Sequence, residues 1–243
     1  MALKSIKLLD KHFDISYEVV NPNAKEDIVF LHGWGSNKDI MKQAFGSYLN
    51  SHRHIYIDMP GFGKSSNEYA LTTKDYSLII EEFFNSLNTN IIAIAGHSFG
   101  GKVATLLNPE NLILLSSAGI LEEKSFDVKM KIKMAKTFNS LGLNKITKAF
   151  RSKDVDKMSE NMYATFKNVV DEDFSNVFES YEKNAMIFWG EEDNATSLSS
   201  GKKIHDLIKN SKFSSYKGDH YFFIKYAQDI AIRIENGIED GIL

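Results

Sequence analysis

Three polar residues far apart in the chain, Ser98, Asp193 and His220, each follow a run typical of a strand. A serine hydroxyl is a weak nucleophile near neutral pH and needs a base within hydrogen-bond reach. A histidine can take the hydroxyl proton, and a carboxylate can orient the imidazole and stabilise its cation. If the fold brings them together, these three side chains could carry out acyl transfer through a covalent intermediate.

The serine lies in a Gly-x-Ser-x-Gly motif, Gly96-His-Ser-Phe-Gly100. An apolar run from residue 91 precedes the motif, and a helix-compatible run, 102–107, follows it. This order predicts a strand, a tight turn and a helix, with the Ser98 hydroxyl exposed on a strained turn. The flanking glycines keep side chains from colliding where strand and helix nearly touch. We therefore interpret Ser98 as a candidate nucleophile, although the motif also occurs by chance.

Among the seven histidines, His220 is the candidate base because it follows the last predicted strand. His32 and His97 also lie next to glycines at strand ends, but such residues are more often hydrogen-bonding scaffold residues than bases. His54 and His205 fall inside predicted elements and carry no functional interpretation.

The candidate acid follows the predicted strand 185–189. The spacing Gly-x-x-Asp after this strand favours Asp193 over its acidic neighbours Glu191 and Glu192. Asp219, beside the candidate base, is interpreted as a solvated loop charge. We therefore expect Asp193 to orient the histidine.

Acyl transfer also needs donors for the oxyanion, and two backbone N–H groups suit this role because they are fixed before the reaction. The residue after the serine, Phe99, would supply one at the start of a helix. Trp34, in a His-Gly-Trp-Gly loop after the predicted strand 27–31, would supply the other. The Trp34 indole either lines a pocket or packs in the core.

The remaining elements alternate between strand and helix, which implies a mostly parallel sheet wound on both faces. Such sheets place their sites at the carboxyl ends of the strands. The predicted strands are 5–9 and 15–20 as an opening hairpin, then 27–31, 54–58, 91–95, 112–116, 185–189 and 213–217. The predicted helices of this core are 38–49, 72–87, 102–107, 200–208 and 221–235.

The segment 121–181 has no strand-like run and no proline, and we expect an inserted helical cap there, between core segments 1–120 and 182–243. Eleven Lys and Arg against six Asp and Glu give residues 121–167 a charge of +5, in a chain whose net charge is −3. An apolar stripe also recurs every four residues: Phe126, Met130, Met134 and Phe138. Either these are ordinary solvated and core faces, or the basic face docks an acidic acyl-carrier protein while the stripe lines an acyl pocket.

Composition excludes several classes of function. The chain of 243 residues contains no cysteine, so disulfides and thiolate metal sites are excluded. It has no metal-ligand spacing, Walker loop or Gly-x-Gly-x-x-Gly motif, and we expect neither a metal nor a cofactor. The net charge gives no reason to expect nucleic acid. Without a signal peptide or an 18-residue apolar run, a cytoplasmic protein with no membrane partner is expected.

Taken together, several motifs resemble those of the α/β-hydrolase superfamily over nearly the whole chain: Leu31-His-Gly-Trp34, Asp58-Met-Pro-Gly-Phe-Gly-Lys-Ser65, Gly96-His-Ser-Phe-Gly-Gly101, Gly190-x-x-Asp193 and Gly218-Asp-His220. The resemblance implies the α/β-hydrolase fold, with an eight-stranded, mostly parallel sheet and a helical cap between strands six and seven. It also implies a Ser98–Asp193–His220 triad. Dehalogenases and epoxide hydrolases of this fold carry an aspartate at the nucleophile position, and Ser98 speaks against both.

Within the superfamily, the motifs are similar to those of small capped esterases, including pimeloyl-acyl-carrier-protein methyl ester esterases. They are also similar to those of meta-cleavage product hydrolases, which cut carbon–carbon bonds. The sequence departs from common patterns at Thr196, where a proline often follows the acid, and in Gly-Asp-His, where Gly-His is common. We expect a carboxylic ester hydrolase acting on a small-molecule ester. The alternatives are carbon–carbon bond hydrolysis of meta-cleavage products, hydrolysis of a pimeloyl-acyl-carrier-protein methyl ester, and a non-catalytic ligand-binding receptor of the same fold.

Overall fold

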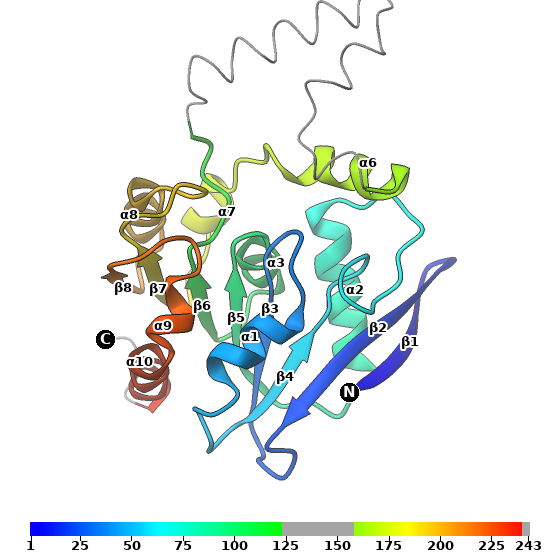
Figure 1. Ribbon diagram of the computed structural model, residues 1–243, viewed down its shortest axis with the longest axis horizontal. Helices are drawn as coiled ribbons and strands as arrows, with labels where there is room; N and C mark the ends of the chain where they lie inside the picture. The colour runs from blue at the N-terminus through cyan, green and yellow to red at the C-terminus, as the bar shows by residue number, and fades with distance from the viewer. Residues whose placement is uncertain (123–157, 240–243) are drawn as a thin grey trace, which may run out of the picture.

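The computed structural model describes residues 1–122 and 158–239, and its centre is an eight-stranded sheet (Figure 1). The strand order is β1-β2-β4-β3-β5-β6-β7-β8. β1 and β4 each pair antiparallel with β2, and the remaining neighbours are parallel. The strands are β1 (Ala2–Leu8), β2 (Lys11–Val20), β3 (Asp27–Leu31), β4 (Arg53–Ile57), β5 (Ile91–His97), β6 (Asn111–Leu115), β7 (Asn184–Gly190) and β8 (Ser211–Tyr216). The predicted eight-stranded, mostly parallel sheet is confirmed.

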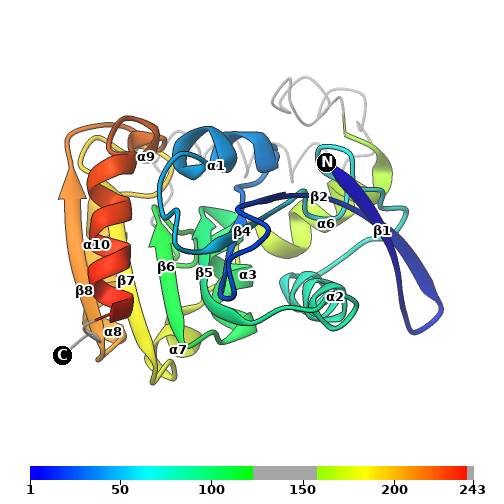
Figure 2. The same cartoon turned by 90° about the horizontal axis from the view of Figure 1, so that it is seen from below.

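Helices cover both faces of the sheet because its central strands are apolar on both sides. In β3, Ile28 and Phe30 belong to one buried cluster, whereas Val29 and Leu31 belong to the other. Helices α1 (Lys38–Phe45), α9 (Phe222–Lys225) and α10 (Ala227–Glu239) complete the first cluster. Helices α2 (Thr73–Asn85), α3 (Phe99–Leu107) and α8 (Leu198–Leu207) complete the second, and Figure 2 shows both layers.

Two helices differ strongly from their predicted bounds, and the other three core helices differ by one to three residues at an end. The helix predicted over 38–49 ends at Phe45, because the chain must turn back toward β4 and does so through Leu49 with φ of +53°. The helix predicted over 221–235 is two helices, α9 and α10. Tyr226 separates them, since its φ of −105° and ψ of 17° leave the helical range.

Two further helices, α6 (Glu160–Val169) and α7 (Ser175–Glu179), fall within the predicted cap. α6 lies over the carboxyl ends of the parallel strands (Figure 1). The Leu71 N–H donates to Thr165 Oγ1 at 2.9 Å, which joins α6 to the loop before α2. Residues 123–157 of the predicted cap, with the apolar stripe and most of the basic residues, lie outside the described residues. Among the described helices, none has both the length and the apolar character needed to cross a bilayer.

Candidate active site

The turn between β5 and α3 holds Ser98 in a strained conformation, with φ of 52° and ψ of −116°. A residue with a side chain adopts such angles at a cost of about 1–3 kcal/mol. The flanking glycines are required by close packing: a Cβ at Gly96 would meet the backbone of Gly100, and one at Gly100 would meet the backbone of Leu31. The predicted strand, turn and helix are confirmed, and the tight packing around the turn holds the serine in place.

Asp193 and His220 are in direct contact, with 2.7 Å between Asp193 Oδ2 and His220 Nδ1. The Asp193 carboxylate is fully buried, and its Oδ1 accepts the backbone N–H groups of Ala195 and Thr196 at 2.8 and 3.0 Å. Burial by itself would raise the pKa of Asp193, but the His220 hydrogen bond and the loop donors lower it to about 2. Asp193 is therefore ionised at neutral pH and directs the His220 Nδ1–H toward itself.

A hydrogen bond also joins the backbone of His220 to the turn that carries Ser98. His97, the residue before Ser98, donates from Nε2 to the backbone carbonyl of His220 at 3.0 Å, and the two rings lie 4.5 Å apart between centroids. Among the described residues, no hydrogen bond joins Ser98 Oγ to the His220 ring. Serine–histidine contacts are often long in the absence of substrate. The fold thus brings Ser98, Asp193 and His220 to one edge of the sheet. The Asp193–His220 hydrogen bond is formed, and the Ser98–His220 hydrogen bond is not.

The two candidate oxyanion donors border the same turn. Phe99 is the first residue of α3, where a helix leaves its N–H groups without intrahelical acceptors. The Trp34 N–H takes no part in the backbone hydrogen bonds of the described loops. A Cβ on Gly33, the residue before Trp34, would lie 3.1 Å from Ser98 Cβ, so this loop passes directly beside the serine. The Trp34 ring contacts those of Phe62, Phe99 and Phe166 and therefore packs beneath α6.

A buried ion pair, which sequence reasoning assigned no role, supports the Trp34 loop. Asp58 Oδ1 accepts the Lys38 N–H at 2.8 Å, and Asp58 Oδ2 accepts the Lys38 ammonium at 2.7 Å and the Lys64 N–H at 3.0 Å. Burial raises the pKa of Asp58, but the contacts with Lys38 outweigh it and lower the pKa below its ordinary value. The pair holds the start of α1, and with it the loop that carries Trp34.

The alternative acids and bases lie elsewhere. Glu191 accepts a hydrogen bond from Ser215 at 2.9 Å, and Glu192 is exposed. Asp219 is exposed and accepts the Tyr221 N–H at 2.9 Å. Among the described residues, neither Glu191, Glu192 nor Asp219 forms a hydrogen bond from its carboxylate to the His220 ring.

The two other histidines at strand ends are scaffold residues. His32 donates from Nδ1 to the Gly33 carbonyl at 2.8 Å and accepts the Met59 N–H on Nε2 at 3.0 Å. Burial lowers the pKa of His32 to about 4 and that of His97 to about 3. Both rings are therefore neutral at pH 7, with their donors committed to the backbone.

A family model described as alpha/beta hydrolase family matches residues 28–191, well over half of the chain. The match contains Trp34, Ser98 and Phe99 and ends just before Asp193. This chain belongs to the alpha/beta hydrolase family. This chain therefore has the fold of the family. The matched residues do not include Asp193 and His220, whose assignment depends on their 2.7 Å contact.

Curated relatives of this alpha/beta hydrolase match it locally. A pimeloyl-[acyl-carrier protein] methyl ester esterase of Shewanella oneidensis is 39% identical over 79 residues, which is 32% of this chain and 28% of the relative. Its counterpart in Pseudoalteromonas atlantica is 37% identical over 101 residues, 38% of this chain and 37% of the relative. The chain spans less than two fifths of the length of these relatives. The esterase EaEST from Exiguobacterium antarcticum shares the fold over 97% of this chain and 98% of its own, with a TM-score of 0.74 and 20% identity.

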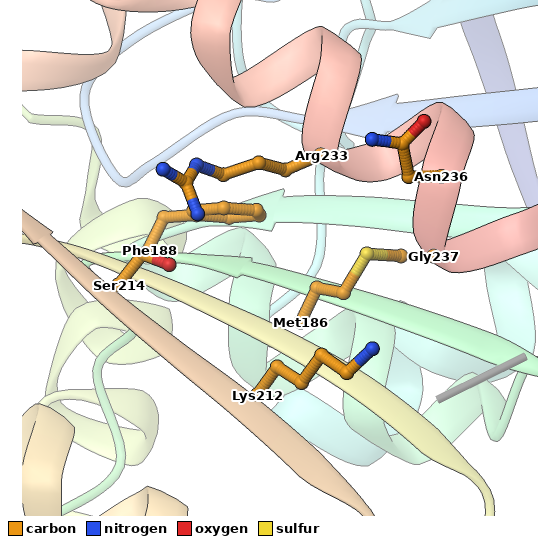
Figure 3. Close-up of a pocket in the computed structure, with 7 residues that line it drawn as sticks. All are labelled: Met186, Phe188, Lys212, Ser214, Arg233, Asn236 and Gly237. Carbon is orange, nitrogen blue, oxygen red and sulfur yellow. The ribbon is translucent and has the colours of Figure 1, made fainter. Parts of the chain in front are cut away.

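Two hollows of this alpha/beta hydrolase differ in their relation to the site. One of about 290 Å³ is bordered by Ala118–Glu122, Val170–Glu172 and Thr196, so it adjoins the Asp193 loop. The other, of about 200 Å³, lies between β7, β8 and α10 (Figure 3). Met186 and Lys212 in its lining are register partners near the amino ends of their strands. The second hollow therefore lies away from the candidate site.

Among the described residues of this family member, no group of three or more His, Cys, Asp or Glu side chains could hold a metal ion. The Asp193 carboxylate is held by the Ala195 and Thr196 N–H groups, whereas the buried Trp34 indole N–H has no hydrogen-bond partner among the described residues. The contact between His220 and the ionised Asp193, beside the strained turn of Ser98, is the arrangement that nucleophilic chemistry uses.

Proposed function

We propose that this chain is a serine hydrolase that cleaves carboxylic esters through an acyl-enzyme intermediate. The observation that carries the proposal is the 2.7 Å contact between the buried Asp193 carboxylate and His220 Nδ1, fastened beside the strained turn of Ser98. His220 Nε2 is the ring nitrogen left to accept the Ser98 proton, since Nδ1–H is directed at Asp193. Ser98 as nucleophile, His220 as base and Asp193 as the acid that orients the base are the three roles that acyl transfer requires.

In the proposed reaction, His220 takes the Ser98 proton while Oγ attacks the ester carbonyl carbon. The amides of Trp34 and Phe99 donate to the oxyanion, and His220 then protonates the leaving alcohol. Water attacks the acyl-enzyme with His220 as base, which releases the acid and restores Ser98. Asp193 stays ionised and stabilises the imidazolium formed in both halves of the reaction.

Labelling with a fluorophosphonate tests the nucleophile. The wild-type protein should incorporate one phosphonate on Ser98, and Ser98→Ala should incorporate none, as read by intact mass and peptide mapping. A panel of p-nitrophenyl esters of increasing chain length, assayed beside a meta-cleavage dienoate, separates ester from carbon–carbon bond hydrolysis. If the protein is labelled but hydrolyses only the dienoate, the function is carbon–carbon bond hydrolysis and the ester proposal is wrong. A protein that binds esters without labelling would be a receptor of this fold.

A narrower substrate is an ester carried by an acidic acyl-carrier protein. Two observations support this substrate. The chain matches pimeloyl-[acyl-carrier protein] methyl ester esterases locally. Residues 121–167, most of them outside the described residues, carry a charge of +5. Neutralising Lys129, Lys133 and Lys136 to glutamine should then weaken hydrolysis of a carrier-linked ester at low salt. A short neutral ester should be unaffected. An equal response of both substrates would rule against the carrier protein.

A further inference from the structure

Thr196 lies in the loop that carries Asp193, and its hydroxyl faces the Asp193–His220 contact. Thr196 Oγ1 is 3.0 Å from Asp193 Oδ2, the oxygen that also contacts His220 Nδ1. The same hydroxyl is 3.2 Å from the Ser116 carbonyl oxygen and 3.5 Å from His220 Nδ1. Thr196 therefore adjoins both members of the pair.

The Thr196 hydroxyl has one proton and two acceptors within reach. The Asp193 carboxylate is both nearer and charged, and hydrogen bonds to a charged acceptor are about twice as strong as neutral ones. The proton on His220 Nδ1 is already directed at Asp193 at the shorter distance of 2.7 Å, which leaves the 3.5 Å approach to Thr196 as a long contact. The preferred acceptor for Thr196 is Asp193 Oδ2.

We propose that Thr196 is a positioning residue that tunes the base: its hydroxyl donates to the carboxylate oxygen that faces His220. The inference rests on the roles proposed above for Asp193 and His220. A second donor on Oδ2 draws negative charge away from the oxygen that stabilises the imidazolium.

Removal of the Thr196 hydroxyl should change the pH dependence of activity in one direction. Without it, Asp193 Oδ2 stabilises the protonated ring more strongly, so the acid limb of activity moves to higher pH. The other groups around the ring do not oppose this. His97 is neutral because its pKa is lowered by burial to about 3, the exposed Asp219 carboxylate is directed at the Tyr221 N–H, and Tyr221 contributes a ring contact.

The experiment compares Thr196→Val, which keeps the shape and loses the hydroxyl, with Thr196→Ser, which keeps the hydroxyl. The pH titration of His220 is followed by NMR through its ring Hε1 signal, assigned by its loss in His220→Gln. We expect the midpoint in Thr196→Val to rise by about half a pH unit, with the acid limb of kcat/KM moving equally. Thr196→Ser should restore the wild-type midpoint. Thr196→Ala should show the same rise as the valine variant without requiring a second methyl group to fit.

The matched control is Thr105→Val. Thr105 is buried in α3 and donates to the Gly101 carbonyl at 2.8 Å, so this variant loses a comparable hydroxyl away from Asp193. Its His220 midpoint should equal that of the wild type. Equal midpoints in the wild type, Thr196→Val and Thr196→Ala would overturn the proposal and assign the hydroxyl to Ser116. Because the NMR titration needs no turnover, a shifted midpoint in a protein without esterase activity would sustain this inference and reject only the proposed function.

Discussion

His97 and His220 are joined by a hydrogen bond of 3.0 Å from the His97 ring to the His220 backbone carbonyl. A carbonyl can only accept, so His97 carries its proton on Nε2. Its Nδ1 is buried and has no hydrogen-bond partner in the described structure. The residue before the candidate nucleophile therefore fixes the backbone of the candidate base.

Replacing His97 with leucine should lower kcat, because the His220 backbone loses its donor while the apolar volume is roughly kept. We expect a fall of about tenfold, the equivalent of one hydrogen bond to a buried carbonyl. His97→Gln retains an N–H and should recover part of the rate. The measurement is kcat and KM on a short nitrophenyl ester. Equal rates in the leucine and glutamine variants would show that the donor is not what matters.

The pH dependence of stability should also change at His97. The pKa of His97 is about 3 in the folded protein, against about 6.5 when unfolded, so between these values only the unfolded chain takes up the proton. The free energy of unfolding therefore falls as pH falls, by about 1.4 kcal/mol per pH unit for this one group. Urea unfolding at pH 6, 5 and 4 should show a slope smaller by that amount in His97→Leu. Parallel curves for the two proteins would contradict the lowered pKa.

Ser98→Ala should abolish turnover and leave stability nearly unchanged. The Ser98 hydroxyl makes no capping hydrogen bond in α3, and its strained backbone angles are kept by alanine. We expect hydrolysis to drop by at least about a thousandfold. Turnover and thermal unfolding of the same preparation separate loss of the nucleophile from loss of the fold. Wild-type rates in the alanine variant would remove Ser98 from the mechanism.

Asp193→Asn should reduce kcat by about four orders of magnitude, because an amide cannot both hold the correct His220 tautomer and stabilise its cation. Glu191→Gln is the matched control, since Glu191 is an acid of the same loop that contacts Ser215 instead. It should cost less than about twofold in activity. A comparable loss in both variants would show that the charge of the loop, and not the contact with His220, supports activity.

Lys102 should contribute more to the free energy of unfolding than an exposed lysine on a helix does. Its buried ammonium contacts Glu172 Oε2 at 2.8 Å and the Val169 carbonyl, which joins α3 to the end of α6. Lys102→Met leaves Glu172 without its cation, and we expect a loss of about 3 kcal/mol in the free energy of unfolding. The double variant with Glu172→Met should recover part of this loss. Lys167→Met, at an exposed lysine of α6, is the control and should change stability by less than about 0.5 kcal/mol.

The sequence by itself determined the elements whose signals are local. Apolar strand runs, glycines at strand ends and the Gly-x-Ser-x-Gly spacing act over a few residues, so they predicted the sheet and the turn of Ser98. The capping box between Thr72 and Asp75 is likewise local, and it marks the start of α2. The break between α9 and α10 escaped prediction, because the residues around Tyr226 keep helical spacing while tertiary packing redirects the chain.

Only the tertiary structure decided which polar groups meet. The spacing Gly-x-x-Asp favoured Asp193 over Glu191 and Glu192, but its burial against His220 depends on the packing of β7 between β6 and β8. The hydrogen bond from His97 to His220 spans 123 positions of sequence, and that from Lys38 to Asp58 spans 20. Such contacts form because strands distant in sequence are neighbours in the sheet, and no local pattern carries that information. The position of the Thr196 hydroxyl beside Asp193 and His220 was decided in the same way.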